Sequence, residues 1–282
     1  MKKTKTKILT VLVLILLAGI YYYVKLPAIN IHADGFWMFL LVVIAAVAVF
    51  YIGRRRLFRK EDIKASGIAK GLIGLFLLVV AVYLAGTLLS SPIINAKKYQ
   101  KLLNVENGDF QTDIKELSFD QIPLLDRDSA TLLGNRKMGS MVDMVSQFEV
   151  DELYSQINYQ DKPVRVSPLR YANVIKWFTN QSEGIPAYIR IDMTTQSTEL
   201  VMLDEGMKYS TSEYFNRNIH RHLRFRYPTY IFGELSFEID DNGVPYWVAP
   251  VKKFNIGLFG GETVGRVVLC NASRGDRRLC DR

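Results

Sequence analysis

Three uncharged apolar segments near the N-terminus constrain this 282-residue chain more than any other feature. They cover residues 8–24, 36–52 and 72–89, and none contains Asp, Glu, Lys or Arg. At about 1.5 Å of rise per residue, helices of this length approach the ~30 Å thickness of a bilayer's hydrocarbon core. None has the polar stripe of a soluble amphipathic helix. We therefore predict a membrane domain over residues 1–90 with three transmembrane helices.

The first segment has an alternative interpretation as a cleaved signal peptide, which its basic start would suit. Residues 21–23 are three consecutive tyrosines, where a signal peptidase requires small side chains. We interpret the segment as an uncleaved helix.

Charge is distributed unevenly between the two parts of the chain. Residues 1–90 carry 12 Lys and Arg against 3 Asp and Glu, whereas residues 91–282 carry 24 against 25. Because the basic excess surrounds the apolar segments, it indicates membrane orientation and excludes a nucleic-acid partner. Basic residues favour the cytoplasmic side, so we expect a cytoplasmic N-terminus and an extracytoplasmic C-terminal domain in a multi-pass protein of the cell membrane. The residues that set this topology are Lys2, Lys3, Lys5, Lys7, Arg54, Arg55, Arg56, Arg59 and Lys60.

None of the three apolar segments contains Asp, Glu, Lys, Arg or His, and none contains a proline. Ion pathways and transporter sites depend on such charged residues or on broken helices. The segments are therefore predicted to anchor the chain in the lipid bilayer, with small residues such as Gly71 and Gly74 allowing close helix packing.

The remainder of the chain alternates irregularly between strand and helix patterns, which indicates an α+β domain with an antiparallel sheet. After a basic connector at residues 91–109, this extracytoplasmic domain is predicted over residues 110–282. An Asn242-Gly243 pair and the stretch at residues 194–196 are predicted to turn two hairpins. Strands are predicted at residues 110–114, 147–151, 164–166, 187–192, 198–203, 234–240, 246–251 and 266–271.

About three helices are predicted in this domain. The first begins near Asp128-Ser129 and ends by Gly139. The second takes Ser167 as its N-cap and Pro168 as its first residue. Its apolar face is formed by residues spaced i, i+3, i+4 and i+7, namely Tyr171, Val174, Ile175 and Phe178. The third opens on a capping-box pattern at residues 210–213 and buries Phe215, Ile219, His222 and Leu223.

The predicted strand at residues 266–271 has no evident return strand in the sequence that follows it. An unpaired strand leaves backbone groups exposed, which suggests a truncated product, and the alternative is a disordered tail. Cys270 and Cys280 would face an oxidising compartment, where they form a disulfide or where Cys270 acts as a small core residue.

No sequence motif identifies a catalytic, cofactor or metal site. Only three histidines occur, and His220 and His222 point to opposite sides of a helix, so neither zinc nor another cofactor is expected. Asp126, Asp128 and Glu149 are candidate carboxylates for hydrolysis. A helical row of arginines is a candidate contact for an anionic surface, comprising Arg217, Arg221, Arg224 and Arg226.

Several short stretches resemble a group of uncharacterised multi-pass membrane proteins of Gram-positive (Firmicutes-type) bacteria that carry a large extracytoplasmic region. The stretches lie at residues 122–126, 134–139, 147–150, 154–159, 184–186, 206–210 and 246–250. The hairpins that end at Asn271-Ala272 also resemble PepSY-type repeats, which are small α+β modules. The resemblance implies a location in a bacterial envelope and no activity or functional residue.

Topology and the missing catalytic pattern together favour a membrane-anchored envelope protein whose outer domain binds a protein or a cell-wall component. Two alternatives stay open, namely an envelope hydrolase with carboxylate chemistry and an accessory subunit of a larger membrane complex. A binding role is favoured over an enzymatic one.

Overall fold

The computed structural model describes residues 2–58, 67–103, 105–114 and 116–281. The chain divides into two compact units. The helical unit comprises Met1–Asn104, Arg224–Ile231 and Lys252–Thr263. The sheet unit comprises Val105–Leu223, Phe232–Val251 and Val264–Arg282. The helical unit therefore includes two later segments in addition to the predicted membrane domain of residues 1–90.

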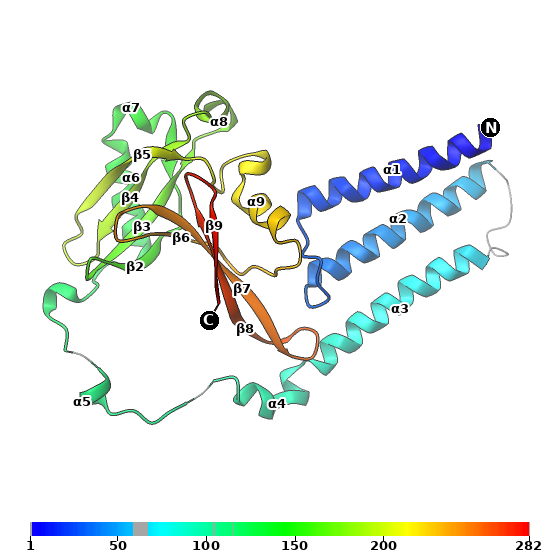
Figure 1. Cartoon of the computed structure of the whole chain (residues 1–282), viewed down its shortest axis with the longest axis horizontal. Helices are drawn as coiled ribbons and strands as arrows, with labels where there is room; N and C mark the ends of the chain where they lie inside the picture. The colour runs from blue at the N-terminus through cyan, green and yellow to red at the C-terminus, as the bar shows by residue number, and fades with distance from the viewer. Residues whose placement is uncertain (1, 59–66, 104, 115, 282) are drawn as a thin grey trace. The chain divides into compact units, whose positions relative to one another are not determined.

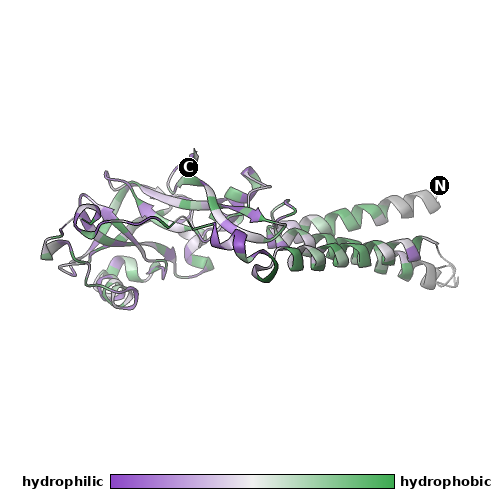
Figure 2. Cartoon of the chain, turned by 90° about the horizontal axis from the view of Figure 1, so that it is seen from below, coloured by the Kyte–Doolittle hydropathy of each residue, from purple (hydrophilic) through white to green (hydrophobic). Residues whose placement is uncertain are grey.

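Four helices form most of the helical unit: α1 (Lys2–Lys25), α2 (Asp34–Phe58), α3 (Gly67–Leu89) and α4 (Pro92–Gln100) (Figure 1). Among the described residues, two helices are long and apolar enough to cross a membrane, α2 over Asp34–Gly53 and α3 over its full length. The described apolar part of α1, Leu9–Lys25, is shorter, so the expected third span is not confirmed. In Figure 2 the described parts of these helices are coloured mostly as hydrophobic.

The two later segments pack against one end of these helices. Trp37 of α2 and Val79 of α3 belong to a buried cluster, and Leu258 and Phe259 pack against that cluster. Ser90, just after α3, accepts hydrogen bonds on its hydroxyl oxygen from the backbone N–H groups of Leu258 (2.9 Å) and Phe259 (3.1 Å). The same hydroxyl donates to the Gly86 carbonyl at 2.6 Å. A single serine thus satisfies the polar backbone of a turn that is buried against an apolar helix end.

The sheet unit contains short helices and two antiparallel sheets, as the predicted α+β class requires. Its helical elements are α5 (Phe110–Asp113), η2 (Phe119–Gln121), α6 (Arg127–Gly139), α7 (Val142–Val145), α8 (Val174–Asn180), η3 (Phe215–Arg217) and the first part of α9 (Ile219–Arg226). Its strands are β1 (Phe148–Val150), β2 (Ser155–Tyr159), β3 (Lys162–Tyr171), β4 (Ile185–Asp192), β5 (Thr198–Met207), β6 (Ser236–Ile239), β7 (Pro245–Ile256), β8 (Gly260–Asn271) and β9 (Arg277–Asp281). The end of β7, the turn and the start of β8, over Lys252–Thr263, belong to the helical unit.

One sheet has the strand order β1-β3-β4-β5 with β2 also paired to β3, and the other has the order β6-β7-β8-β9. The core of the sheet unit includes the fully buried rings of Tyr188, Phe237 and Trp247. Their centroids are 6.0 Å apart for Tyr188 and Phe237 and 5.5 Å apart for Phe237 and Trp247. The Trp247 indole N–H donates to the Tyr209 carbonyl at 2.9 Å, which satisfies its polar atom inside the core.

Both predicted hairpins are confirmed. The turn at Asn242-Gly243 joins β6 to β7, with the Gly243 N–H donating to the Asp240 carbonyl at 2.8 Å and Gly243 at φ 78°. The turn at residues 194–196 joins β4 to β5. Helix α6 matches the first predicted helix, but it starts at Arg127, and its N-cap is Asp126 and not Asp128-Ser129, because Asp126 accepts from the Ser129 N–H at 2.7 Å.

Four local predictions are wrong. Residues 110–114 are not a strand, because Phe110–Asp113 form the short helix α5, which Asp109 caps by accepting from the Gln111 N–H. Ser167 and Pro168 lie inside β3, where Ser167 pairs with Ile189 and Pro168 with Tyr188, so the predicted helix starts only after Asn173. Asn173 accepts from the N–H groups of Ile175 and Lys176, which makes it the true N-cap.

The third predicted helix begins later than its capping-box pattern indicated. Residues 210–218 form an irregular segment and the short helix η3, and α9 starts at Ile219. Ile219 and Leu223 are buried as predicted, whereas Phe215 is exposed. The predicted lack of a return strand for β8 is also wrong, because β9 pairs with it from Arg266↔Asp281 to Cys270↔Arg277.

Candidate functional site: a polar cavity beside an exposed aromatic ledge

A cavity of about 500 Å³ opens on the sheet unit where β1 and β3 meet the segment before α9. Polar side chains dominate its wall. It is lined by Glu149 of β1, Arg170 and Tyr171 of β3, residues 172–173, residues 211–214, Asn218 and Arg221. A cavity of this size and polarity suits a polar group of a ligand or partner.

Glu213 is the deepest charged residue of this wall, with 2% of its surface exposed. Its carboxylate accepts a hydrogen bond from the Tyr171 hydroxyl at 3.0 Å and another from the Trp177 indole N–H at 2.7 Å. Burial raises the pKa of the Glu213 carboxyl, and the hydrogen bonds from Trp177 and Tyr171 act in the opposite direction. The carboxylate therefore ties β3, α8 and the segment before η3 together at one point.

The segment that carries Glu213 is held by further contacts at the cavity floor. The Ser212 hydroxyl accepts from the Tyr171 N–H at 3.3 Å, and the Thr211 hydroxyl donates to the Asp151 carboxylate at 3.1 Å. The Asn218 amide donates to the carbonyls of Thr211 and Glu213 at 3.0 and 3.1 Å. These bonds satisfy a segment that has almost no regular secondary structure of its own.

An exposed apolar surface, here called the aromatic ledge, lies beside the cavity. It comprises Val174, Ile175, Phe178, Tyr214 and Phe215, which are between 43% and 70% exposed. The buried Trp177 ring supports it, with centroid distances of 4.7 Å to Tyr214, 6.0 Å to Phe215 and 6.4 Å to Phe178. Tyr214 belongs to both features, since it also lines the cavity. The ledge and the cavity are therefore one continuous surface.

Phe215 has an unusual backbone conformation for an exposed aromatic residue. Its φ is 51°, in the left-handed region that bulky side chains rarely adopt. Such strain persists only where surrounding contacts enforce it, and it is concentrated at functional sites. Here the Phe215 carbonyl accepts from the Asn218 N–H at 3.3 Å, which closes the turn that displays the ring.

The rim of the cavity carries a solvated ion pair. Arg170 Nη2 lies 3.0 Å from Glu149 Oε2, and both side chains are about half exposed. The two residues sit opposite each other in the register between β1 and β3. An exposed pair of this kind contributes little to stability, so both groups can exchange their partner for a ligand at small cost.

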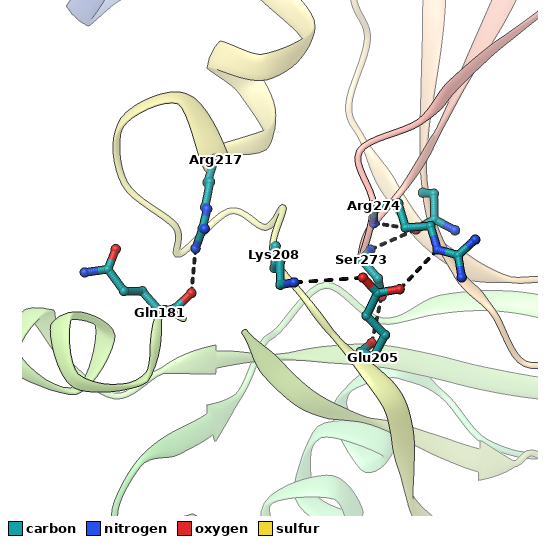
Figure 3. Close-up of polar contacts among 7 residues, drawn as sticks. Gln181, Glu205, Lys208, Arg217, Ser273 and Arg274 are labelled. Atoms are coloured by element: carbon teal, nitrogen blue, oxygen red, sulfur yellow. Dashed lines mark hydrogen bonds and ion pairs between the residues drawn. The ribbon is translucent and has the colours of Figure 1, made fainter. Parts of the chain in front are cut away.

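The four arginines of the predicted row lie in different structural surroundings and do not form one exposed face. Arg217 belongs to η3 and donates to the Gln181 carbonyl at 2.5 Å (Figure 3), whereas Arg221 lines the cavity. Arg224 is buried in the helical unit and donates to the carbonyls of Leu26 (2.9 Å) and Tyr230 (2.5 Å). Arg226 is exposed at the end of α9. Arg224 is thus a bridging cation within the fold, and contact with an anionic surface stays a prediction for the other three.

A second polar cluster of the sheet unit involves Glu205 at the end of β5. Its carboxylate lies 3.1 Å from Arg274 Nε and 3.9 Å from Lys208 Nζ (Figure 3). Ser273 donates from its hydroxyl to the Glu205 carbonyl at 2.9 Å. These bonds fix the turn between β8 and β9, and every side chain in the cluster is engaged by a neighbour.

The candidate carboxylates for hydrolysis have different roles. Asp126 caps α6, and the backbone N–H of Ser129 lowers the pKa of that carboxyl. Asp128 is exposed in the first turn of α6, and Glu149 pairs with Arg170 at the cavity. Within the described residues, no group of three or more His, Cys, Asp or Glu side chains is placed to hold a metal ion. Cys270 is buried, Cys280 is exposed, and both are free thiols.

The topology-setting residues lie at the ends of α1 and α2. Lys2, Lys3, Lys5 and Lys7 are in the first turns of α1, and Arg54, Arg55 and Arg56 are in the last turns of α2. Arg59 and Lys60 lie outside the described residues.

Comparison of the chain with protein-family models gave no match, and searches of curated proteins and of solved structures gave none. The function is therefore inferred from the site itself. Glu213 and Trp177 were not predicted as site residues, and the capping-box pattern at residues 210–213 indicated only a helix start for Glu213. The available signal was the pair of aromatic dipeptides, Trp177-Phe178 and Tyr214-Phe215, in polar surroundings.

Proposed function

We propose that this chain is a membrane-anchored protein of the cell envelope whose C-terminal region faces away from the cytoplasm and binds a partner protein. The observation that carries the proposal is the aromatic ledge, an exposed apolar surface continuous with the polar cavity. Two membrane-length apolar helices and the basic residues that flank them support the anchoring and the orientation.

The composition of the ledge favours a protein as the partner. Protein interfaces combine aromatic and aliphatic residues at their centre with arginines and other polar residues at their rim. The ledge supplies Phe178, Phe215 and Ile175, and the cavity supplies Arg170 and Arg221 beside it. A site for a sugar polymer would be expected to place aromatic faces within a mostly polar groove. The ledge is instead mostly apolar, and three of its side chains are carried by one short helix, α8.

The contacts that hold the ledge in place also support a protein as the partner. Glu213 holds Trp177, and Trp177 lies beneath the exposed rings. A surface that is ordered before binding loses little conformational entropy when a partner arrives. The same arrangement would serve an accessory subunit of a larger membrane complex, in which the partner is a permanent neighbour.

Site-specific photo-crosslinking in intact cells tests the proposal. A benzoylphenylalanine at position 178 should give a discrete crosslinked product, and the same group at Leu132 or Met202, which are comparably exposed apolar positions, should not. The substitution Phe215→Ser should reduce the yield from position 178 at least ten-fold, since removal of a central aromatic anchor costs about 2 kcal/mol or more.

Two results would contradict the proposal. One is an equal crosslink yield from position 178 and from the control positions. The other is a crosslinked product that is a cytoplasmic protein, because the proposed orientation excludes that contact.

A further inference from the structure

Helix α4 follows the membrane-length helix α3 directly and has exposed side chains of two kinds. Ile93 is 93% exposed, and Ile94 and Leu103 are also exposed. Three exposed basic side chains follow the isoleucines, namely Lys97 and Lys98 of α4 and Lys101 just after it, and Pro92, Ala96 and Gln100 are exposed as well. Residues 90–105 contain no Asp or Glu, so this segment has a charge of +3.

The position of α4 relative to the end of α3 is fixed by hydrogen bonds within the helical unit. The Tyr99 hydroxyl donates to the Ser90 carbonyl at 2.7 Å and accepts from the Gly261 N–H at 3.2 Å. The Asn95 amide donates to the Leu89 carbonyl at 2.6 Å, and the backbone bends at Asn95, with φ −114° and ψ 25°. The polar side chains Asn95 and Tyr99 thus face the protein, and the isoleucines and lysines face outward.

We infer that α4 is an interfacial helix that binds anionic phospholipid headgroups at the membrane surface where α3 ends. Only three residues separate Leu89 from Ile93, so α4 begins within the headgroup layer if α3 spans the bilayer. At that depth exposed isoleucines insert into the acyl boundary, and lysines extend to the phosphates. The inference uses the membrane position of α3 and does not depend on the ledge or its partner.

The charge pattern determines the lipid class. A zwitterionic headgroup offers no net attraction to three lysines, whereas an anionic headgroup attracts each of them. The absence of acidic side chains between residues 90 and 105 leaves this attraction uncompensated along the segment.

A probe on α4 in defined vesicles tests the inference with the full chain. Ala96 is exposed between the isoleucines and the lysines, so Ala96→Cys carrying an environment-sensitive fluorophore reports their surroundings. Cys280→Ser removes the exposed natural thiol, and Cys270 is buried. The protein is reconstituted in phosphatidylcholine vesicles and in vesicles of phosphatidylcholine and phosphatidylglycerol at a ratio of about seven to three.

The fluorophore should be less accessible to an aqueous quencher in the vesicles that contain phosphatidylglycerol, and high salt should abolish the difference. Each lysine is expected to contribute about five-fold to the preference for the anionic lipid. The triple variant Lys97→Gln, Lys98→Gln, Lys101→Gln should therefore lose the preference. The matched triple variant Arg136→Gln, Lys162→Gln, Arg278→Gln, which removes three cations from the sheet unit, should retain it.

Equal quenching in both vesicles, or an unchanged preference in the Lys97, Lys98, Lys101 variant, would overturn the inference. Binding of inorganic polyphosphate by the detergent-solubilised protein, combined with equal quenching in both vesicles, would assign these lysines to a soluble polyanion instead. A crosslinking failure at the ledge would leave each of these outcomes unaffected.

Discussion

The indole nitrogen of Trp177 lies 2.7 Å from Glu213 Oε2 and donates a hydrogen bond to it. The two residues are 36 positions apart in the chain, and the bond joins α8 to the segment before η3. Tyr171 donates to the other carboxylate oxygen at 3.0 Å. A buried acid with two donors is a structural link, and it determines where the ledge aromatic residues are held.

Glu213→Ala should destabilise the sheet unit by about 2–4 kcal/mol, because two buried donors lose their acceptor. Glu213→Gln should cost much less, since the amide oxygen can accept from Trp177 and the amide nitrogen can donate to the Tyr171 oxygen. Thermal unfolding of the full chain in detergent measures both effects. Equal losses for the two variants would show that the hydrogen bonds at Glu213 are not what the fold requires.

The stability difference between the wild type and Glu213→Gln should depend on pH. The pKa of Glu213 is raised in the folded state, so the folded protein holds the proton more tightly than the unfolded chain does. The wild type should therefore gain most relative to Glu213→Gln below about pH 4.3, the ordinary pKa of glutamate. That gain should decline as the pH rises through the folded-state pKa and then level off. Unfolding midpoints collected from pH 4 to pH 8 test this, and an increase with pH would contradict it.

Tyr154 and Tyr171 are both buried tyrosines, and they differ in whether the hydroxyl has a hydrogen-bond partner. The Tyr154 hydroxyl is buried and has no hydrogen-bond partner among the described residues, and Gly134 leaves the space it occupies. Tyr154→Phe should be neutral or stabilising, because it removes a buried polar atom that has no partner. Tyr171→Phe should cost about 1–2 kcal/mol, because Glu213 loses a donor. Denaturant unfolding of both variants is the measurement, and a larger loss for Tyr154→Phe would reverse the assignment.

Ser90→Ala should destabilise the helical unit by about 2–4 kcal/mol. The Leu258 and Phe259 N–H groups would lose their acceptor in a partly buried turn. Thr87→Ala is the control, since the exposed Thr87 hydroxyl donates to the Tyr83 carbonyl one helical turn earlier. Protease sensitivity of the turn at residues 257–259 should rise for Ser90→Ala alone. Similar behaviour of the two variants would argue against a special role for Ser90.

The two cysteines provide a natural test of orientation. Cys280 is exposed, whereas Cys270 is buried and burial raises the pKa of its thiol to about 12. A membrane-impermeant maleimide added to intact cells should label the chain once, and Cys280→Ser should abolish the label. Labelling that appears only after the cells are opened would place the C-terminal region in the cytoplasm.

The elements that the sequence predicted well are those governed by local chemistry. The first predicted helix is α6, although its N-cap is Asp126 and not Asp128-Ser129, and the Asn242-Gly243 pair turns the hairpin between β6 and β7, with Gly243 at a positive φ that glycine adopts without steric cost. One helical spacing pattern predicted a buried stripe that the structure does not have, at Tyr171, Val174, Ile175 and Phe178. Tyr171 is held in β3 by the strand beside it, and the other three are exposed where a buried stripe was expected.

The sequence alone determined the apolar helices α2 and α3, the basic residues that flank them and the antiparallel α+β character of the remainder. These properties depend on solvent preference and on contacts between near neighbours, so composition and spacing are sufficient. Only the tertiary structure decided that Glu213 would meet Trp177 and Tyr171, that the ledge would be exposed, and that Leu258 and Phe259 would pack beside Ser90. The contacts of Glu213 and of Ser90 join residues that are tens to more than a hundred positions apart. No local pattern carries that information, because such pairings are selected by how the whole chain packs and satisfies its buried polar groups.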